Sequence, residues 1–209
     1  MRPIMIAVLL ASSFTGLAVP YHAAQAQSQM SPSYSFLEAV KKRDGEKVTS
    51  LLQVPGTNVV NARQRDDGRT AMHMVVERRD SAWIRFLLAK NANPNIGDDD
   101  GNTPLMLATQ LGYLDGMETL LTYGAKVNQT NRAGETPLIR AVQLRDSETV
   151  RMLLKHGADA DITDNVSGRS ARDYARLDNR SRTILDLLDA KPDAPATKAD
   201  GELDFSGIK

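Results

Sequence analysis

A seven-residue block recurs along this chain at intervals of 33 or 34 residues. The blocks are DGRTAMH, DGNTPLM, AGETPLI and SGRSARD, and they begin at residues 67, 100, 133 and 167. Leu-Leu pairs keep nearly the same interval, at 51–52, 87–88, 120–121, 153–154 and 187–188. A period of this length indicates supersecondary units that stack on their neighbours, because one such unit cannot bury its own apolar face.

Each block has the composition of a tight turn that leads into a helix. Its glycine suits a turn that demands positive φ, and the Thr or Ser two residues later is a good N-cap. Pro104 and Pro137 then take the first helical position, where no backbone N–H is needed. We therefore expect pairs of short helices, for example residues 104–111 followed by 114–122. Gly124, Gly157 and Asn91 fit the left-handed residue that ends the second helix.

Composition narrows the chemistry that the chain can perform. There are no cysteines, which excludes disulfides, thiolate metal sites and a cysteine nucleophile, and three scattered histidines do not suggest a zinc site. The formal net charge is zero, so we expect no nucleic-acid partner. No phosphate loop, nucleophile elbow or zinc-protease motif is present. Asp98–Gly101 lacks the alternating ligands of a calcium loop and is interpreted as a turn tip. The sequence therefore predicts neither an enzyme nor a cofactor.

The blocks, the paired helices ending in Leu-Leu and the following Gly-Ala together resemble the ankyrin repeat, best at residues 101–128 and 134–161. The resemblance covers about residues 33–190 and implies an all-α solenoid of about five stacked helix-turn-helix units with protruding β-turns. The expected units are 33–62, 63–97, 98–130, 131–163 and 164–190, with a polar unit at each end. Ser35 to Glu38 fits a capping box at the first helix.

The chain departs from the family pattern in several units, where Arg79, Arg145 and Asn179 replace the glycine usual between the two helices. Its histidine survives as His73, which we interpret as a structural residue bonded near Thr70. Gly116 lies within an expected second helix and should weaken it by about 1 kcal/mol relative to Ala. Trp83, Phe86 and Leu121 are interpreted as packing residues, and Leu121→Ala should cost about 2–5 kcal/mol.

The resemblance also implies a protein partner bound across a concave face of turn tips and exposed first-helix residues. By position, the residues expected on this face are Asp66, Asp67, Arg69, Glu77, Arg78, Asp99, Asp100, Asn102, Gln110, Leu111, Arg132, Glu135, Gln143, Leu144, Val166, Ser167 and Arg169. Leu111 and Leu144 either form an exposed apolar pair between the tips at 98–100 and 132 or pack on neighbouring turns.

Residues 1–26 have the pattern of a secretory signal peptide. Arg2 supplies the positive charge, residues 4–10 begin an apolar run, and Ala24-Gln25-Ala26 offers a cleavage site after Ala26. The alternative is an uncleaved anchor, but polar residues interrupt the run before the length that a membrane span requires. We expect a periplasmic protein with no membrane span after cleavage.

The two ends of the chain beyond the repeats are polar. Residues 27–32 form a short lead, and residues 191–209 are predicted to be disordered because they contain only three large apolar groups. Leu203-Asp204-Phe205 is an alternative docking motif within that tail. The leading functional hypothesis is a monomeric protein-binding scaffold of the bacterial envelope. The alternative is a regulatory subunit or immunity-type inhibitor of an envelope or stress enzyme.

Overall fold

The computed structural model describes residues 31–56 and 58–190. In these ranges the chain forms ten α-helices, one short 3₁₀ helix (η1, Val59–Asn61) and no strand beyond two isolated bridges. The helices are α2 (Pro32–Lys41), α3 (Gly45–Leu52), α4 (Ala71–Glu77), α5 (Ser81–Ala89), α6 (Pro104–Gln110), α7 (Leu114–Thr122), α8 (Pro137–Gln143), α9 (Ser147–Lys155), α10 (Ala171–Leu177) and α11 (Arg182–Asp189). They form five helix pairs, which confirms the predicted all-α repeat solenoid.

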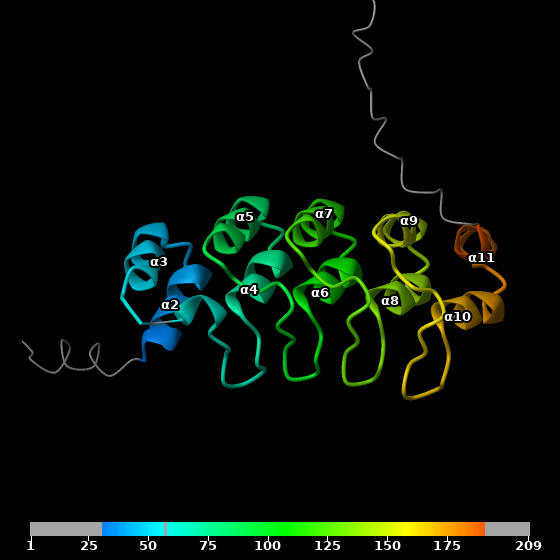
Figure 1. Ribbon diagram of the computed structural model, residues 1–209, viewed down its shortest axis with the longest axis horizontal. Coiled ribbons are helices and arrows are strands. Elements are labelled where there is room, and N and C mark those ends of the chain that lie inside the picture. The colour runs from blue at the N-terminus through cyan, green and yellow to red at the C-terminus, as the bar shows by residue number, and fades with distance from the viewer. Residues whose placement is uncertain (1–30, 57, 191–209) are drawn as a thin grey trace, which may run out of the picture. The chain divides into compact units, whose positions relative to one another are not determined.

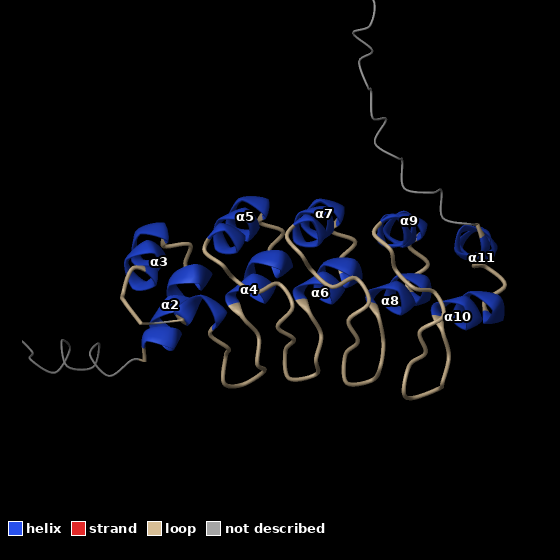
Figure 2. Cartoon of the chain, in the orientation of Figure 1, coloured by secondary structure: helices blue, strands red, loops and turns tan. Residues whose placement is uncertain are grey.

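The helices lie in two layers (Figure 1). The first helices of the pairs, α2, α4, α6, α8 and α10, form one layer, and the second helices, α3, α5, α7, α9 and α11, form the other. Four loops project from the side of the first-helix layer, each entering one first helix from α4 onward (Figure 2). We call these loops the hairpins; they comprise residues 62–70, 97–103, 130–136 and 163–170. Isolated bridges close the first and last hairpins, between Arg63 and Thr70 and between Thr163 and Ser170.

Side chains cap the first helices as the blocks predict. The hydroxyls of Thr103, Thr136 and Ser170 accept from the backbone N–H three residues later, at 3.3, 3.2 and 3.2 Å. Each bond satisfies one of the N–H groups that the first turn of a helix leaves free. Gly124 and Gly157 have φ of +88° and +83°, which confirms the left-handed termination of α7 and α9.

Three arginines adopt positive φ, which is uncommon for a residue with a side chain. They are Arg43, Arg79 and Arg145, with φ of 59°, 56° and 56°. Each follows a first helix and reaches the next unit: Arg43 pairs with Asp80 at 3.0 Å, Arg79 donates to the Leu111 carbonyl at 2.5 Å, and Arg145 pairs with Asp178 at 2.5 Å. Each of the three arginines with a strained backbone therefore also bonds to a residue of the next unit.

One apolar core runs through the stack. The residues of the Leu-Leu pairs differ in burial: Leu87, Leu120 and Leu153 are fully buried, whereas Leu121 and Leu154 are only half-buried. Leu121 therefore packs against the core, as predicted, but from a partly exposed position. In these pairs the first leucine is the more deeply buried of the two, and Leu88 is buried as well.

The two end units differ from the inner ones. Helix α2 begins at Pro32 and not at the predicted capping box of Ser35, because proline is well suited to a first helical turn. In the last unit Arg172 stands where the preceding unit has the buried Leu138. It pairs with Asp161 at 3.0 Å and also with Asp189. A charged residue suits this position because no further unit among the described residues covers it.

The predicted signal peptide, polar lead and C-terminal tail lie outside the described residues, except Ser31 and Pro32 of the lead. Within the described part of the chain, no helix has the length and hydropathy needed to cross a bilayer.

Candidate partner-binding face

The candidate site is the surface formed by the four hairpins and the exposed sides of α4, α6, α8 and α10, which we call the hairpin face. Backbone hydrogen bonds hold the hairpins side by side. Asp99 N–H donates to the Asp67 carbonyl at 2.9 Å, and Arg132 N–H donates to the Asp100 carbonyl at the same distance. Asn165 N–H donates to the Ala133 carbonyl at 2.7 Å. The spacing of the tips is therefore fixed by main-chain bonds.

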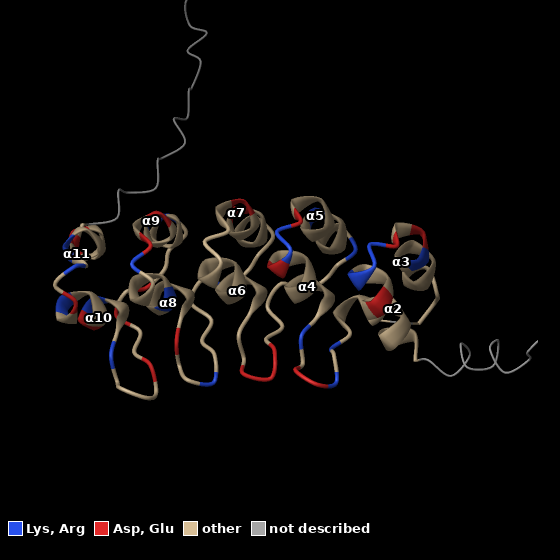
Figure 3. Cartoon of the chain, turned by 180° about the vertical axis from the view of Figure 1, so that it is seen from behind, with Lys and Arg blue, Asp and Glu red and all other residues tan. Residues whose placement is uncertain are grey.

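The charge of the hairpins changes along the stack (Figure 3). Asp99 and Asp100 form an exposed acidic tip before α6, whereas Arg132 forms an exposed basic tip before α8. The last tip bears Val166, which is 83% exposed. A partner that spans these tips meets acidic, basic and apolar groups in turn.

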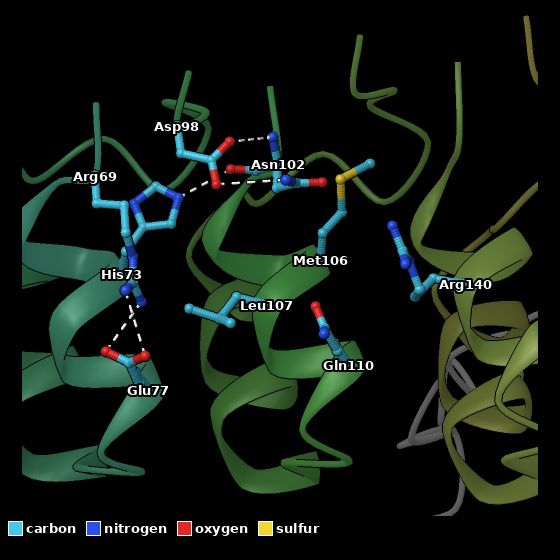
Figure 4. Close-up of a pocket in the computed structure, with 9 residues that line it drawn as sticks. All are labelled: Arg69, His73, Glu77, Asp98, Asn102, Met106, Leu107, Gln110 and Arg140. Carbon is cyan, nitrogen blue, oxygen red and sulfur yellow. Dashed lines mark hydrogen bonds and ion pairs between the residues drawn. The ribbon is translucent and has the colours of Figure 1, made fainter. Parts of the chain in front are cut away.

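A hollow of about 220 Å³ lies in the hairpin face (Figure 4). Helices α4, α6 and α8 and the hairpins before α4 and α6 surround it. The residues that line it are Arg69, His73, Glu77, Asp98, Asn102, Met106, Leu107, Gln110 and Arg140. Its volume is close to that of one large side chain.

Two ion pairs stand on opposite sides of this hollow. Arg69 pairs with Glu77 at 3.0 Å on the α4 side, and Arg140 pairs with Glu135 at 2.6 Å on the α8 side. Between them, α6 contributes the uncharged side chains of Met106, Leu107 and Gln110. The hollow therefore combines two apolar side chains, Met106 and Leu107, with charged and hydrogen-bonding groups around them, a combination that can hold one side chain of a partner.

His73 fixes the α4 side of the hollow. The Thr70 N–H donates to His73 Nδ1 at 3.1 Å, so the ring proton lies on Nε2, which faces the Asn102 carbonyl at 2.9 Å. Burial lowers the pKa of His73 below its ordinary value, against the opposing effect of the bond to Asn102. This arrangement confirms the structural role predicted for His73 and shows that it joins one unit to the hairpin of the next.

Most residues predicted on the partner-binding face are exposed or half-buried there. The exposed ones are Asp66, Asp99, Asp100, Arg132, Val166, Ser167, Arg169, Glu77, Gln110, Gln143 and Leu144, and the half-buried ones include Asp67, Arg69, Asn102 and Glu135. The structure brings four of them together around the hollow, namely Arg69, Glu77, Asn102 and Gln110.

Two predicted residues do not belong to this face. The Arg78 guanidinium donates to the Val40 carbonyl at 2.7 Å and lies 5.1 Å from the Trp83 ring, so it joins α4 to α2 and α5. Leu111 is half-buried against the core, whereas Leu144 is 49% exposed. Of the two arrangements expected for these leucines, Leu111 therefore packs on the core and Leu144 is exposed, and each directly follows the last residue of its helix, α6 or α8.

Sequence reasoning missed Met106, Leu107, Asp98 and Arg140 as lining residues. Leu107 and Arg140 occupy the same helical position in consecutive units, a signal that alignment of the units could have provided. Asp98 forms the predicted turn, since its Oδ1 accepts from the N–H groups of Asp100 and Asn102 at 3.0 and 2.8 Å. The described residues contain no group of three or more acidic, histidine or cysteine side chains placed to hold a metal ion.

Comparison with known proteins agrees with this architecture. A family model described as "Ankyrin repeats (3 copies)" matches residues 36–131, and a second, "Ankyrin repeats (many copies)", matches residues 112–175. The chain is also similar to the nuclear factor NF-kappa-B p110 subunit of Drosophila melanogaster, with 37% identity over 57 residues. That match covers 27% of this chain and only 6% of the relative. Ankyrin repeats are interaction modules that bind other proteins and are typically not enzymes. The two family matches together span residues 36–175 of the 209, and the chain belongs to the ankyrin-repeat family.

Proposed function

We propose that this protein is a non-enzymatic scaffold of the bacterial cell envelope that binds a partner protein across its hairpin face. The observation that supports the proposal is the hollow at α6, where Met106 and Leu107 lie between two ion pairs. An apolar side chain of the partner would enter the hollow, and its polar neighbours would meet Arg69, Arg140 or the hairpin tips. In protein interfaces most of the binding energy usually comes from a few such buried side chains, which polar contacts surround.

A pull-down with paired variants tests this site. Gln110→Arg places a long charged side chain at an exposed position on the edge of the hollow, and it should not disturb folding. Arg151→Glu changes an exposed residue of α9, in the other helix layer, and serves as the control. We expect a crosslinked partner to be captured by the parent and by Arg151→Glu but lost with Gln110→Arg. Equal capture by all three would place the interface away from the hollow.

The envelope location is proposed from the N-terminal sequence pattern. We propose that residues 1–26 direct export and are removed after Ala26, which leaves a mature chain starting at Gln27. N-terminal sequencing of the protein from the periplasmic fraction of a Gram-negative host tests this. An intact Met1 in the membrane fraction would support the uncleaved anchor instead.

The pull-down also separates the scaffold hypothesis from its alternative. A captured enzyme whose rate changes when the protein binds would identify a regulatory subunit or inhibitor. A captured protein with no such change would support the scaffold.

A further inference from the structure

A second apolar surface lies in the other helix layer, between α3 and α5. The groove has a volume of about 630 Å³ and is lined by Gly45, Glu46, Thr49, Ser50, Gln53, Ala82, Trp83 and Phe86. The rings of Trp83 and Phe86 meet edge to face, with centroids 5.5 Å apart and planes at 69°. Both rings are half-buried: they pack against the core, as predicted, and their remaining surface lines the groove.

The groove is open because its two walls differ in size. Helix α3 presents Gly45, Thr49 and Ser50, which are too small to cover the two aromatic rings of α5. One unit later, the residues that correspond to Trp83 and Phe86 are Gly116 and Thr119 of α7. These side chains are small, so α7 presents no aromatic rings at the corresponding positions. The exposed parts of the two rings offer an apolar surface on which the apolar side chains of a bound segment can pack.

Glu46 is the one charged residue among those that line the groove, and a basic residue lies just beyond the lining at the other end. Glu46 lies in the first turn of α3, and exposed Lys90 follows Phe86 by one helical turn at the end of α5. A bound segment would therefore be favoured if it had an acidic residue before its apolar groups and a basic residue after them, running from the Lys90 end toward the Glu46 end.

The chain itself contains such a segment. Residues 203–208 hold the three large apolar side chains Leu203, Phe205 and Ile208, preceded by Glu202 and followed by Lys209. In extended form these six residues span about 16 Å, and the groove from Gly45 to Gln53 is about 12 Å long.

The distance from the end of α11 to the groove is within reach. Helices that pack together lie about 8–10 Å apart, and α7 and α9 stand between α5 and α11 in the second-helix layer, which places the groove about 28–35 Å from α11. Residues 191–202 link Ala190 to the apolar segment and can span about 40 Å. We propose that the groove between α3 and α5 binds Leu203–Ile208 of the same chain. The bound segment joins the last unit to the first across the second-helix layer and leaves the hairpin face free.

Trp83 reports directly on this groove because it is the one tryptophan of the chain. The test compares acrylamide quenching of its fluorescence in the full mature chain and in a Leu203→Ser, Phe205→Ser double variant. A tether of this length gives an effective concentration of about 1 mM, so the segment is expected to shield the ring in much of the population. The quenching constant should rise about 1.5-fold or more in the double variant, with a red shift of the emission. Ser206→Ala, which keeps all three apolar groups, should match the parent.

A variant of the groove provides an independent measurement. Ser50→Glu places a charge in the groove from an exposed position of α3, and it should raise the quenching constant as the double variant does. Far-UV circular dichroism of each variant should equal that of the parent. Quenching that is the same in the parent, the double variant and Ser50→Glu would overturn the proposal. Shielding that increases with protein concentration would also overturn it, because the bound segment would then come from a second copy.

Discussion

Gly116 lies inside helix α7, where glycine is usually unfavourable, and the structure predicts that replacing it with alanine destabilises the protein. A Cβ added at Gly116 would lie 2.3 Å from both Cδ1 and Cε1 of Tyr113. Carbon atoms in contact are normally about 3.5–4.0 Å apart, so the ring would have to move by more than about 1 Å.

The Tyr113 ring is held in place from several sides. It is only 8% exposed, its hydroxyl bonds the Ser81 hydroxyl, and the Arg79 guanidinium lies 5.9 Å from the ring centroid. Movement would break these contacts between the second and third units. This is why the expectation from helix propensity alone, that Gly116 weakens α7, is reversed by the packing.

The magnitude follows from three contributions. Over-packing of a buried site costs about 1–3 kcal/mol, and loss of the Tyr113–Ser81 hydrogen bond costs about 1 kcal/mol. Alanine gains about 1 kcal/mol of helix propensity over glycine. We therefore expect Gly116→Ala to lower the free energy of unfolding by about 1–3 kcal/mol.

Urea unfolding followed by circular dichroism measures this change, and a second background isolates its cause. In a Tyr113→Ala protein the clash is absent, so Gly116→Ala should stabilise that protein by up to about 1 kcal/mol. The reasoning is refuted if Gly116→Ala raises or leaves unchanged the unfolding midpoint of the parent.

Three further predictions concern the hydrogen bonds and core of the stack. Burial lowers the pKa of His73 in the folded state, so its contribution to stability is complete above the ordinary pKa of 6.5 and is lost as the pH falls below that value. The urea unfolding midpoint should therefore fall between pH 7.5 and pH 5 in the parent and change less over this range in His73→Met. An equal change in both proteins would contradict this. The pKa of Asp164 is lowered to about 2, mainly by the hydrogen bond from the Tyr174 hydroxyl and next by that from the Ser167 backbone N–H. The ionised carboxylate therefore stabilises the fold above pH 3.8, and this stabilisation is lost as the pH falls through 2. Tyr174→Phe should cost about 1–2 kcal/mol at neutral pH and less at pH 2, as measured by thermal unfolding. Leu120→Ala should cost about 2–5 kcal/mol and Leu121→Ala clearly less, since only Leu120 is fully buried, and equal losses in urea unfolding would contradict the burial difference.

The sequence by itself determined the number of units, the helix pairs and the caps. These features depend on local rules, because a glycine at positive φ, a Thr N-cap and a proline at the first helical position act within a few residues of chain. The predicted helix at 114–122 therefore agrees with α7, and His73 bonds to Thr70 as expected.

The tertiary structure decided which side chains share a surface. Leu107 and Arg140 line the same hollow although they are 33 residues apart in the sequence. Leu111, one helical turn after Leu107, packs against the core and does not line the hollow. Trp83 lines a groove because the facing residues of α3 are small, which no rule about α5 alone could predict. Burial at a given position depends on the sizes of side chains in the neighbouring unit, and the repeat pattern specifies the positions of these side chains without specifying their sizes.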